Sequence, residues 1–331
     1  MNLVKSSLIV LIGAIFMSGC AQKVSVRALQ PAEVSRAALT KKVAVTPFQN
    51  DQPNISGKIE AGLAKHKLDG KQYFTIISRQ DLNKVLTEQK IQNSGIIDPS
   101  TATEVGKLIG AQAIISGRTG KPSTADTNFY ETRIKCNKDH CWEVTVSCKK
   151  RIAGLNAEIR MIDTQKGDII YADTINKKGS WKHCQDDSRA LPSTNMAAQT
   201  LASQIASDFT YKLVPHYVYY DVTLLEDPDL EYTDQQEALL DNALLFIKQK
   251  RYDRAKKILN KLIASTNGKS YVPIYNIAVV TEAEGQYEAA KELYIKADNL
   301  TVKPVKEINI AINHIDQVIE KNKQALKQLK K

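Results

Sequence analysis

The chain has 331 residues, 43% of them hydrophobic and 25% charged, and a formal net charge of +10. This composition is ordinary for a globular protein and excludes a disordered chain, and the length is sufficient for two domains. Most of the positive charge lies in the first two thirds of the chain, which favours an acidic partner such as another protein, lipid phosphates or wall carboxylates.

The first twenty residues have the pattern of an export signal. Lys5 precedes an apolar run, Leu8 to Met17, that is too short to span a bilayer as a helix. The run ends in the sequence MSGC, which resembles the lipobox of bacterial lipoproteins, where the cysteine is acylated and becomes the first residue. We therefore expect a lipoprotein signal peptide over residues 1–19 and lipidation at Cys20.

A lipidated Cys20 implies where the chain is held. Residues 20–40 would form the tether between the lipid and the first domain. Ala21 stands where an aspartate would resemble the inner-membrane retention signal of enterobacterial lipoproteins, so the resemblance implies the periplasmic face of the outer membrane. Several acyl chains, each contributing about 0.8 kcal/mol per buried CH₂, form a stable membrane anchor. Nucleic acid is not an expected partner of an exported protein.

Predicted strands and helices alternate over residues 41–225, the expected first domain. Short apolar runs predict strands, apolar residues at helical spacing predict helices, and Asp98-Pro99 is typical of a helix start. The order predicts an α/β sandwich with a mixed sheet, in the α+β class. The predicted strands cover residues 41–48, 73–78, 111–117, 152–163 and 168–176, and the predicted helices cover residues 55–68, 79–92, 98–109 and 196–213.

A further hairpin is expected before the strand at residue 152. Apolar residues alternate in Tyr130–Cys136 and again in Trp142–Cys148, which predicts two amphipathic strands of about eight residues each. A turn that places Cys136 opposite Cys141 suits a disulfide, whereas matching the two apolar faces requires Cys136 opposite Trp142. The two registers conflict, and the sequence leaves both open.

Four cysteines remain besides Cys20, and an even number in an oxidising compartment indicates two disulfides. The first choice is Cys136–Cys141 together with Cys148–Cys184. The alternative is a zinc site, although the spacing of its candidate ligands fits no strong zinc-binding pattern. Those candidates are Cys136, His140, Cys141, His183 and Cys184.

Four sequence segments of the first domain occur in an order typical of one protein family. They are VAVTPF, YFTIISRQDLNKVLTEQ, IGAQAIISG and LNAEIRMIDTQKGDIIYADT, and they lie between residues 41 and 213. Behind a lipobox, they resemble the curli-secretion lipoprotein family (CsgG/HfaB-like), which is related to penicillin-binding-protein activator lipoproteins and to flagellar accessory lipoproteins. The resemblance implies this α/β domain and a role in the cell envelope.

The family also includes a secretion channel, in which two insertions of the domain form membrane hairpins. The equivalent segments here would be residues 119–149 and 176–194. The second segment is heavily charged, and the predicted strands of the first are short for a membrane, so the sequence argues against a channel.

Residues 226–331 are expected to form a helical second domain. Tyr252 and Tyr287, Ala255 and Ala290, and Leu259 and Tyr294 each lie 35 residues apart. The pattern resembles tetratricopeptide repeats, which implies two helical repeats followed by a capping helix.

No catalytic motif is present, so we predict a non-enzymatic accessory protein with no cofactor and no resident metal. Its expected partners are envelope proteins of the secretion, flagellar or peptidoglycan-synthesis machinery, and homo-oligomer formation is left open. The alternative functions are activation of a peptidoglycan synthase (a penicillin-binding protein) and, less favoured, an oligomeric outer-membrane secretion channel. The candidate partner-binding residues are Tyr252, Tyr275, Tyr287, Tyr294, Lys149, Lys150 and Arg151.

Overall fold

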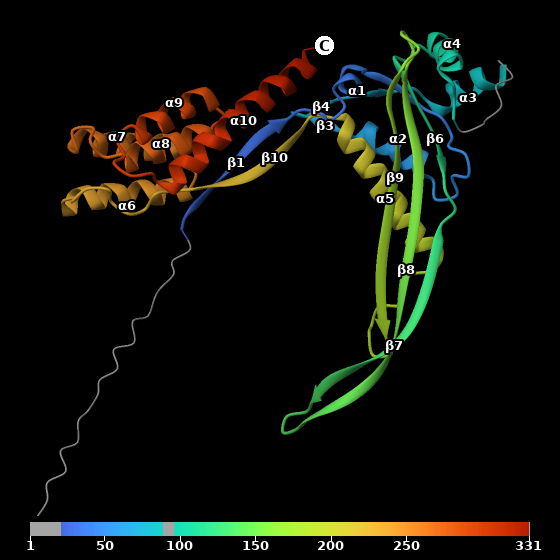
Figure 1. Ribbon diagram of the computed structural model, residues 1–331, viewed down its shortest axis with the longest axis horizontal. Helices are drawn as coiled ribbons and strands as arrows, with labels where there is room; N and C mark the ends of the chain where they lie inside the picture. The colour runs from blue at the N-terminus through green and yellow to red at the C-terminus, as the bar shows by residue number, and fades with distance from the viewer. Residues whose placement is uncertain (1–20, 89–95, 331) are drawn as a thin grey trace, which may run out of the picture. The chain divides into compact units, whose positions relative to one another are not determined.

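The computed structural model describes residues 21–88 and 96–330, which fold as two compact units (Figure 1). The sheet unit comprises Leu29–Val218 with the chain end from Glu320, and the helical unit comprises Tyr219–Ile319 with the described residues up to Ala28. The predicted signal peptide and Cys20 lie outside the described residues. None of the described helices combines the length and apolar character that a membrane crossing requires.

The sheet unit is built on a mixed sheet, as predicted. Strands β5, β2 and β6 run parallel, and β8 pairs antiparallel with β6, β7 and β9. The hairpin of β8 and β9 around Thr164–Gly167 is confirmed, with both strands longer than predicted. The strands are β2 (Lys42–Val45), β5 (Thr75–Ile76), β6 (Ala113–Thr119), β7 (Ser123–Cys136), β8 (Cys141–Asp163) and β9 (Ile169–Cys184).

Helices cover both faces of this sheet, which confirms the predicted sandwich and the α+β class. Val43 and Val45 pack with α2 and α5, whereas Ala44 between them packs with α3 and α4, because successive strand residues point to opposite faces. Asp98 caps α4, as predicted, by accepting hydrogen bonds from the backbone N–H groups of Ser100 and Thr101. The helices are α1 (Ser35–Leu39), α2 (Ile55–Lys65), α3 (Arg79–Glu88), α4 (Pro99–Ile109) and α5 (Thr194–Leu213).

Two predicted segments fold differently. Residues 20–40 are not a simple tether, because Lys23–Gln30 forms β1, which pairs with β10 (His216–Thr223), and α1 follows. The helix predicted over residues 55–68 ends at Lys65, since β3 (Lys67–Leu68) and β4 (Lys71–Gln72) form a small hairpin. Its turn needs two positive φ angles, at Asp69 and Gly70, so Gly70 makes a hairpin turn and does not end the helix.

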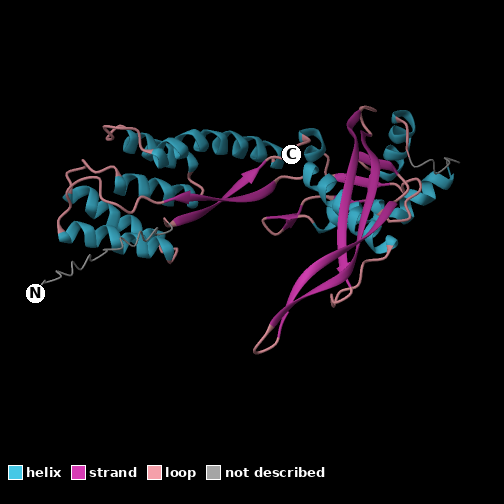
Figure 2. Cartoon of the chain, turned by 60° about the horizontal axis from the view of Figure 1, so that its bottom comes forward, coloured by secondary structure: helices cyan, strands magenta, loops and turns pink. Residues whose placement is uncertain are grey.

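The helical unit, whose helices are cyan in Figure 2, contains two helix pairs. Their connecting turns have the same backbone geometry. Lys250 and Gly285, 35 residues apart, both have positive φ, at 58° and 80°. The next residues, Arg251 and Gln286, have nearly identical angles, φ −90° and ψ 64° against φ −91° and ψ 65°. The helices are α6 (Asp234–Lys248), α7 (Tyr252–Ser265), α8 (Val272–Ala283), α9 (Tyr287–Asp298) and α10 (Lys306–Leu329).

The last turns of α10 pack into the core of the sheet unit. Ala325 is fully buried there, and Leu329 packs against the same core. The Gln328 side chain, 5% exposed, accepts a hydrogen bond of 2.8 Å from the Ala32 N–H and donates one of 3.1 Å to Ser35 Oγ. The end of the chain is therefore part of the fold of this unit.

We predict that Gln328→Ala lowers the free energy of unfolding of the sheet unit by about 1–3 kcal/mol, because the buried Ala32 N–H loses its partner. Gln324→Ala, one turn earlier at an exposed position that contacts Glu320, should change it by less than about 0.5 kcal/mol. The chain's two tryptophans, Trp142 and Trp181, both belong to this unit, so tryptophan fluorescence in urea measures its unfolding. Equal effects of the two substitutions would contradict the prediction.

Candidate functional site

The candidate site is an arm of the sheet unit, formed by residues 123–154 and 177–192. Strand β7 pairs along its whole length with the first part of β8, from Ser123 opposite Gly154 to Cys136 opposite Cys141. Strand β9 pairs on the other side of β8 as far as Cys184, opposite Cys148. Beyond that point only the β7–β8 hairpin continues, and Figures 1 and 2 show it extending past the helices of the unit.

The register of this hairpin resolves the conflict left by the sequence. Cys136 lies opposite Cys141, so Tyr130 and Ile134 share one face with Ser147 and Glu143. The apolar residues of β8 lie on the opposite face, so of the two registers that the sequence left open, the one with Cys136 opposite Trp142 is wrong. Strand β7 also has 14 residues, so the predicted length of about eight was wrong.

Two disulfides fix the arm, and they are the pairs that the sequence favoured. Cys136–Cys141 closes the hairpin turn, and Cys148–Cys184 joins β8 to the end of β9. Cys148 and Cys184 are buried in a small apolar cluster with Val146, against which Phe129 and Val144 pack.

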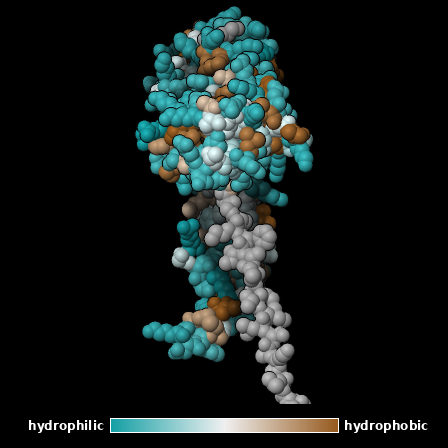
Figure 3. All heavy atoms as spheres, turned by 90° about the vertical axis from the view of Figure 1, so that its left-hand side faces the viewer, coloured by the Kyte–Doolittle hydropathy of each residue, from teal (hydrophilic) through white to brown (hydrophobic). Residues whose placement is uncertain are grey.

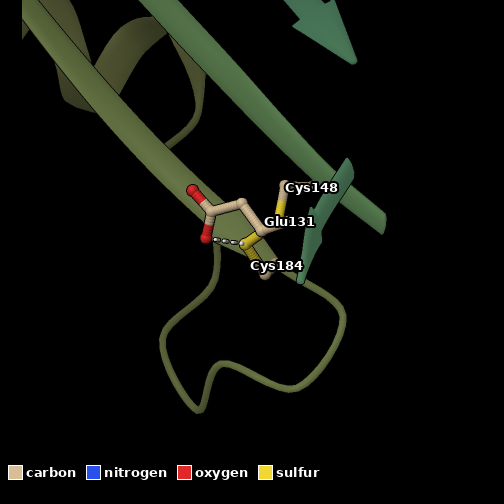
Figure 4. Close-up of side chains that lie close together, drawn as sticks. All are labelled: Glu131, Cys148 and Cys184. Carbon is tan, nitrogen blue, oxygen red and sulfur yellow. Dashed lines mark hydrogen bonds between the residues drawn. A yellow bond between two sulfur atoms is a disulfide. The ribbon is translucent and has the colours of Figure 1, made fainter. Parts of the chain in front are cut away.

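The zinc site considered from the sequence is wrong, because the sulfur atoms of its cysteines are engaged in disulfides. Across the described ranges, the group of His, Cys, Asp and Glu side chains close enough to share an ion is Glu131, Cys148 and Cys184 (Figure 4). A metal-binding cysteine must be a thiolate, so this group is a carboxylate oxygen 3.7 Å from a disulfide sulfur.

Ion pairs hold the loop after β9 against the hairpin. Arg133 Nη1 donates to Asp186 at 2.7 Å and to Asp187 at 3.1 Å. Asp187 also accepts a hydrogen bond from the Cys184 N–H, and this bond, followed by Arg133, holds the pKa of Asp187 below its ordinary value. Lys182 pairs with Glu131 across the strands. The end of the arm is therefore held in one conformation by covalent and ionic links.

The basic residues predicted to bind a partner divide into two groups. Lys149 and Lys150 are exposed on opposite faces of β8. Arg151 instead has a structural role, since it donates to both carboxylate oxygens of Asp126 and to the Pro192 carbonyl. Of the three, the two lysines can contact a partner directly.

Three of the four tyrosines predicted to bind a partner are core residues. Tyr275, Tyr287 and Tyr294 are buried, so direct contact with a partner was a wrong expectation, and Tyr252 is half-buried. Their hydroxyl groups hold the chain's own segments, because Tyr275 donates to the Thr223 carbonyl and Tyr287 to the Arg27 carbonyl.

Sequence reasoning missed Asn276, which completes this internal contact. Its amide accepts from the Leu225 N–H at 3.0 Å and donates to the Leu225 carbonyl at 2.8 Å. The available signal was a single asparagine within the apolar sequence VPIYNIAVV, since a buried amide must find partners. The helices of this unit thus bind an extended segment of their own chain.

The arm carries the most exposed aromatic and aliphatic side chains of the sheet unit. Tyr130 is 76% exposed and Ile134 is 71% exposed, on the face that also carries Lys149. We call this surface, Tyr130, Ile134 and Lys149, the arm face. In Figure 3, the coloured side chains are mostly hydrophilic, with hydrophobic ones scattered among them.

We predict that replacing Cys148 and Cys184 by Ala lowers the free energy of unfolding more than replacing Cys136 and Cys141 by Ala. The first pair closes a sequence separation of 36 and the second a separation of 5. Loop-closure entropy then gives about 4 kcal/mol against about 2 kcal/mol. Urea unfolding followed by tryptophan fluorescence measures both losses. A larger loss from the turn disulfide would contradict this account.

Part of the sheet unit matches the model of a known protein family. Residues 33–185 match the family model described as "Curli production assembly/transport component CsgG", which confirms the resemblance found in the sequence. A search of curated proteins finds no match.

Similar solved structures include lipoprotein GNA1162 from Neisseria meningitidis, with 13% identity over 50% of this chain and 98% of that one, at a TM-score of 0.25. LpoB from E. coli has 11% identity over 56% and 82%, at 0.26. The PelC dodecamer from Paraburkholderia phytofirmans has 18% identity over 57% and 98%, at 0.23. Because these TM-scores are low, they carry no argument, and the resemblance of residues 33–185 to the CsgG family rests on the family model alone.

Proposed function

We propose that the chain is a non-enzymatic lipoprotein, held at the periplasmic face of the outer membrane through Cys20, that serves as an adaptor in envelope assembly or secretion. The observation that carries the proposal is an arm fixed by two disulfides on a domain that matches the CsgG family model. Disulfides persist in oxidising compartments such as the periplasm, which supports export. The MSGC sequence supports the lipid anchor.

The arm face is the proposed contact surface for the partner. Tyr130 and Ile134 expose apolar area on one face of β7, with Thr132 between them, and aromatic side chains often dominate binding energy. The disulfides and the ion pairs of Arg133 already order the arm, so association would cost little conformational entropy. Lys149 on the same face favours an acidic partner surface.

The helical unit is proposed to be tetratricopeptide-like. Its repeats bind a segment of the same chain and so have a structural role. The equal turn geometry at Lys250 and Gly285 supports the repeat relationship. The hydrogen bonds of Asn276 and Tyr275 to residues 223–225 occupy groups that could otherwise bind a peptide. We therefore place partner binding on the arm and not on the repeat tyrosines.

A second candidate is an oligomeric outer-membrane secretion channel. The 14-residue strand β7 removes one of the two sequence arguments against it, the short length of the hairpin. Charged residues on both strands, such as Arg133 and Glu143, still favour the adaptor. Reproducible large conductance from the detergent-purified protein in planar bilayers would favour the channel.

We predict that Cys20→Ala moves the protein from the membrane fraction to the soluble fraction, because the acylated thiol is lost. Fractionation of cell envelopes and mass spectrometry of the amino-terminal residue measure the change. Ser18→Ala keeps a small residue before the cysteine and should leave the fractionation unchanged. Membrane association that survives the cysteine substitution would argue against lipidation.

We predict that Tyr130→Ala combined with Ile134→Ala reduces crosslinked capture of the partner from intact envelopes at least tenfold. The matched control is Tyr219→Ala combined with Leu245→Ala, which removes exposed apolar side chains of the helical unit. Equal capture by both double variants would contradict the arm face as the contact surface. The captured protein distinguishes secretion or flagellar machinery from a penicillin-binding protein.

A further inference from the structure

A pocket of about 360 Å³ lies within the helical unit, between α8, the first turns of α10 and strand β10. Its lining combines aromatic rings, aliphatic side chains and carboxylates, the mixture found in sites for small organic groups. The lining residues are Tyr220, Asp221, Val222, Thr223, Tyr275, Glu282, Lys306, Glu307, Ile310, Ala311 and His314.

Glu282 places a buried carboxylate at this pocket. The residue is only 1% exposed, and its two carboxylate oxygens accept hydrogen bonds of 2.6 Å from the hydroxyl groups of Tyr220 and Tyr294. Burial, followed by the charge of Glu282, raises the pKa of both tyrosines, so both remain protonated donors. Among the described residues, the hydrogen-bond donors to the Glu282 carboxylate are these two neutral hydroxyl groups.

A buried carboxylate that is held by neutral hydroxyl groups alone keeps a large part of its desolvation cost. A cation in the pocket would offset that cost. Glu307 adds a second carboxylate to the lining, beside one lysine, Lys306, and one histidine, His314. Two carboxylates, those of Glu282 and Glu307, therefore stand against one lysine in this lining.

The other side chains that line the pocket favour an organic cation over a metal ion. The half-buried ring of Tyr220, which meets the His314 ring in a T-shaped contact at 4.4 Å, lines the pocket and can attract an ammonium group. Ile310 and Ala311 offer apolar contact for an alkyl chain. A metal ion fits less well, because the described residues of this pocket include no three ligand atoms close enough to share one. We propose that this pocket binds a primary ammonium group on a short alkyl chain, the group that a lysine side chain presents.

This site is independent of the proposed function. All its lining residues belong to the helical unit, whereas the arm face belongs to the sheet unit. Loss of the lipid anchor or of arm binding would leave the pocket intact. The proposal can therefore be tested on purified protein without reference to the envelope partner.

The test titrates n-pentylammonium into the full chain and follows the NMR signals of the Ala311 methyl group and the tyrosine rings. We expect saturable shifts, and at least tenfold weaker binding of 1-pentanol, which has nearly the same shape without the charge. Glu282→Gln should weaken n-pentylammonium binding at least tenfold. Glu292→Gln makes the same charge change at an exposed position of α9 outside the pocket and should have no effect.

Three results would overturn the proposal: no saturable shift, equal binding of 1-pentanol, or unchanged binding in a folded Glu282→Gln protein. If Glu282→Gln does not fold, Ile310→Trp replaces it as the deciding variant. Ile310 is 58% exposed, so a larger side chain there can fill the mouth of the pocket without disturbing the core. Binding should then be lost at least tenfold while circular dichroism stays unchanged, and retained binding would overturn the proposal.

Discussion

Strand β8 runs without interruption for 23 residues, and its backbone hydrogen bonds connect the core of the sheet unit to the arm. Its second part pairs with β6 on one side and β9 on the other, where Ile159 and Met161 are fully buried. Its first part leaves that core and pairs with β7. Because a paired strand cannot bend freely, the buried part determines the direction in which the arm extends.

The arm depends on this strand and then adds its own constraints. Where β9 ends, hydrogen bonding on one side of β8 stops, and the Cys148–Cys184 disulfide lies at that position. Arg133 joins the following loop to β7 through Asp186 and Asp187. These links replace the core that a narrow hairpin cannot build, so exposed side chains such as Tyr130 keep a defined arrangement.

In the helical unit the repeat pattern is present, but the tyrosines expected to bind a partner are occupied by contacts within the chain. The small and aromatic residues of the repeats pack the helices, and Tyr275 and Tyr294 are buried as a result. Their hydroxyl groups, together with Asn276, hold residues of the same chain and the Glu282 carboxylate. The pocket beside Glu282 combines carboxylates with apolar side chains, which favours a small organic cation as its ligand.

The sequence alone determined the features that depend on neighbouring residues. Asp98-Pro99 starts a helix because a side chain and a fixed φ act within one turn, and the 35-residue spacing of Tyr252 and Tyr287 reflects equal local turns. The number of the cysteines favoured two disulfides, and the pairing that was the first choice is confirmed, but only the structure decided against the zinc alternative and the other hairpin register.

Only the tertiary structure decided the features that depend on distant partners. A one-residue change of register moves every side chain of a strand to the other face, so the sequence could not tell which face Tyr130 shares. The sequence suggested a tether for residues 23–39, because the strand with which β1 pairs, β10, lies about two hundred residues later in the chain. The sequence pattern of the repeats does not tell a buried tyrosine from an exposed one. Packing against the rest of the chain placed Tyr275, Tyr287 and Tyr294 in the core.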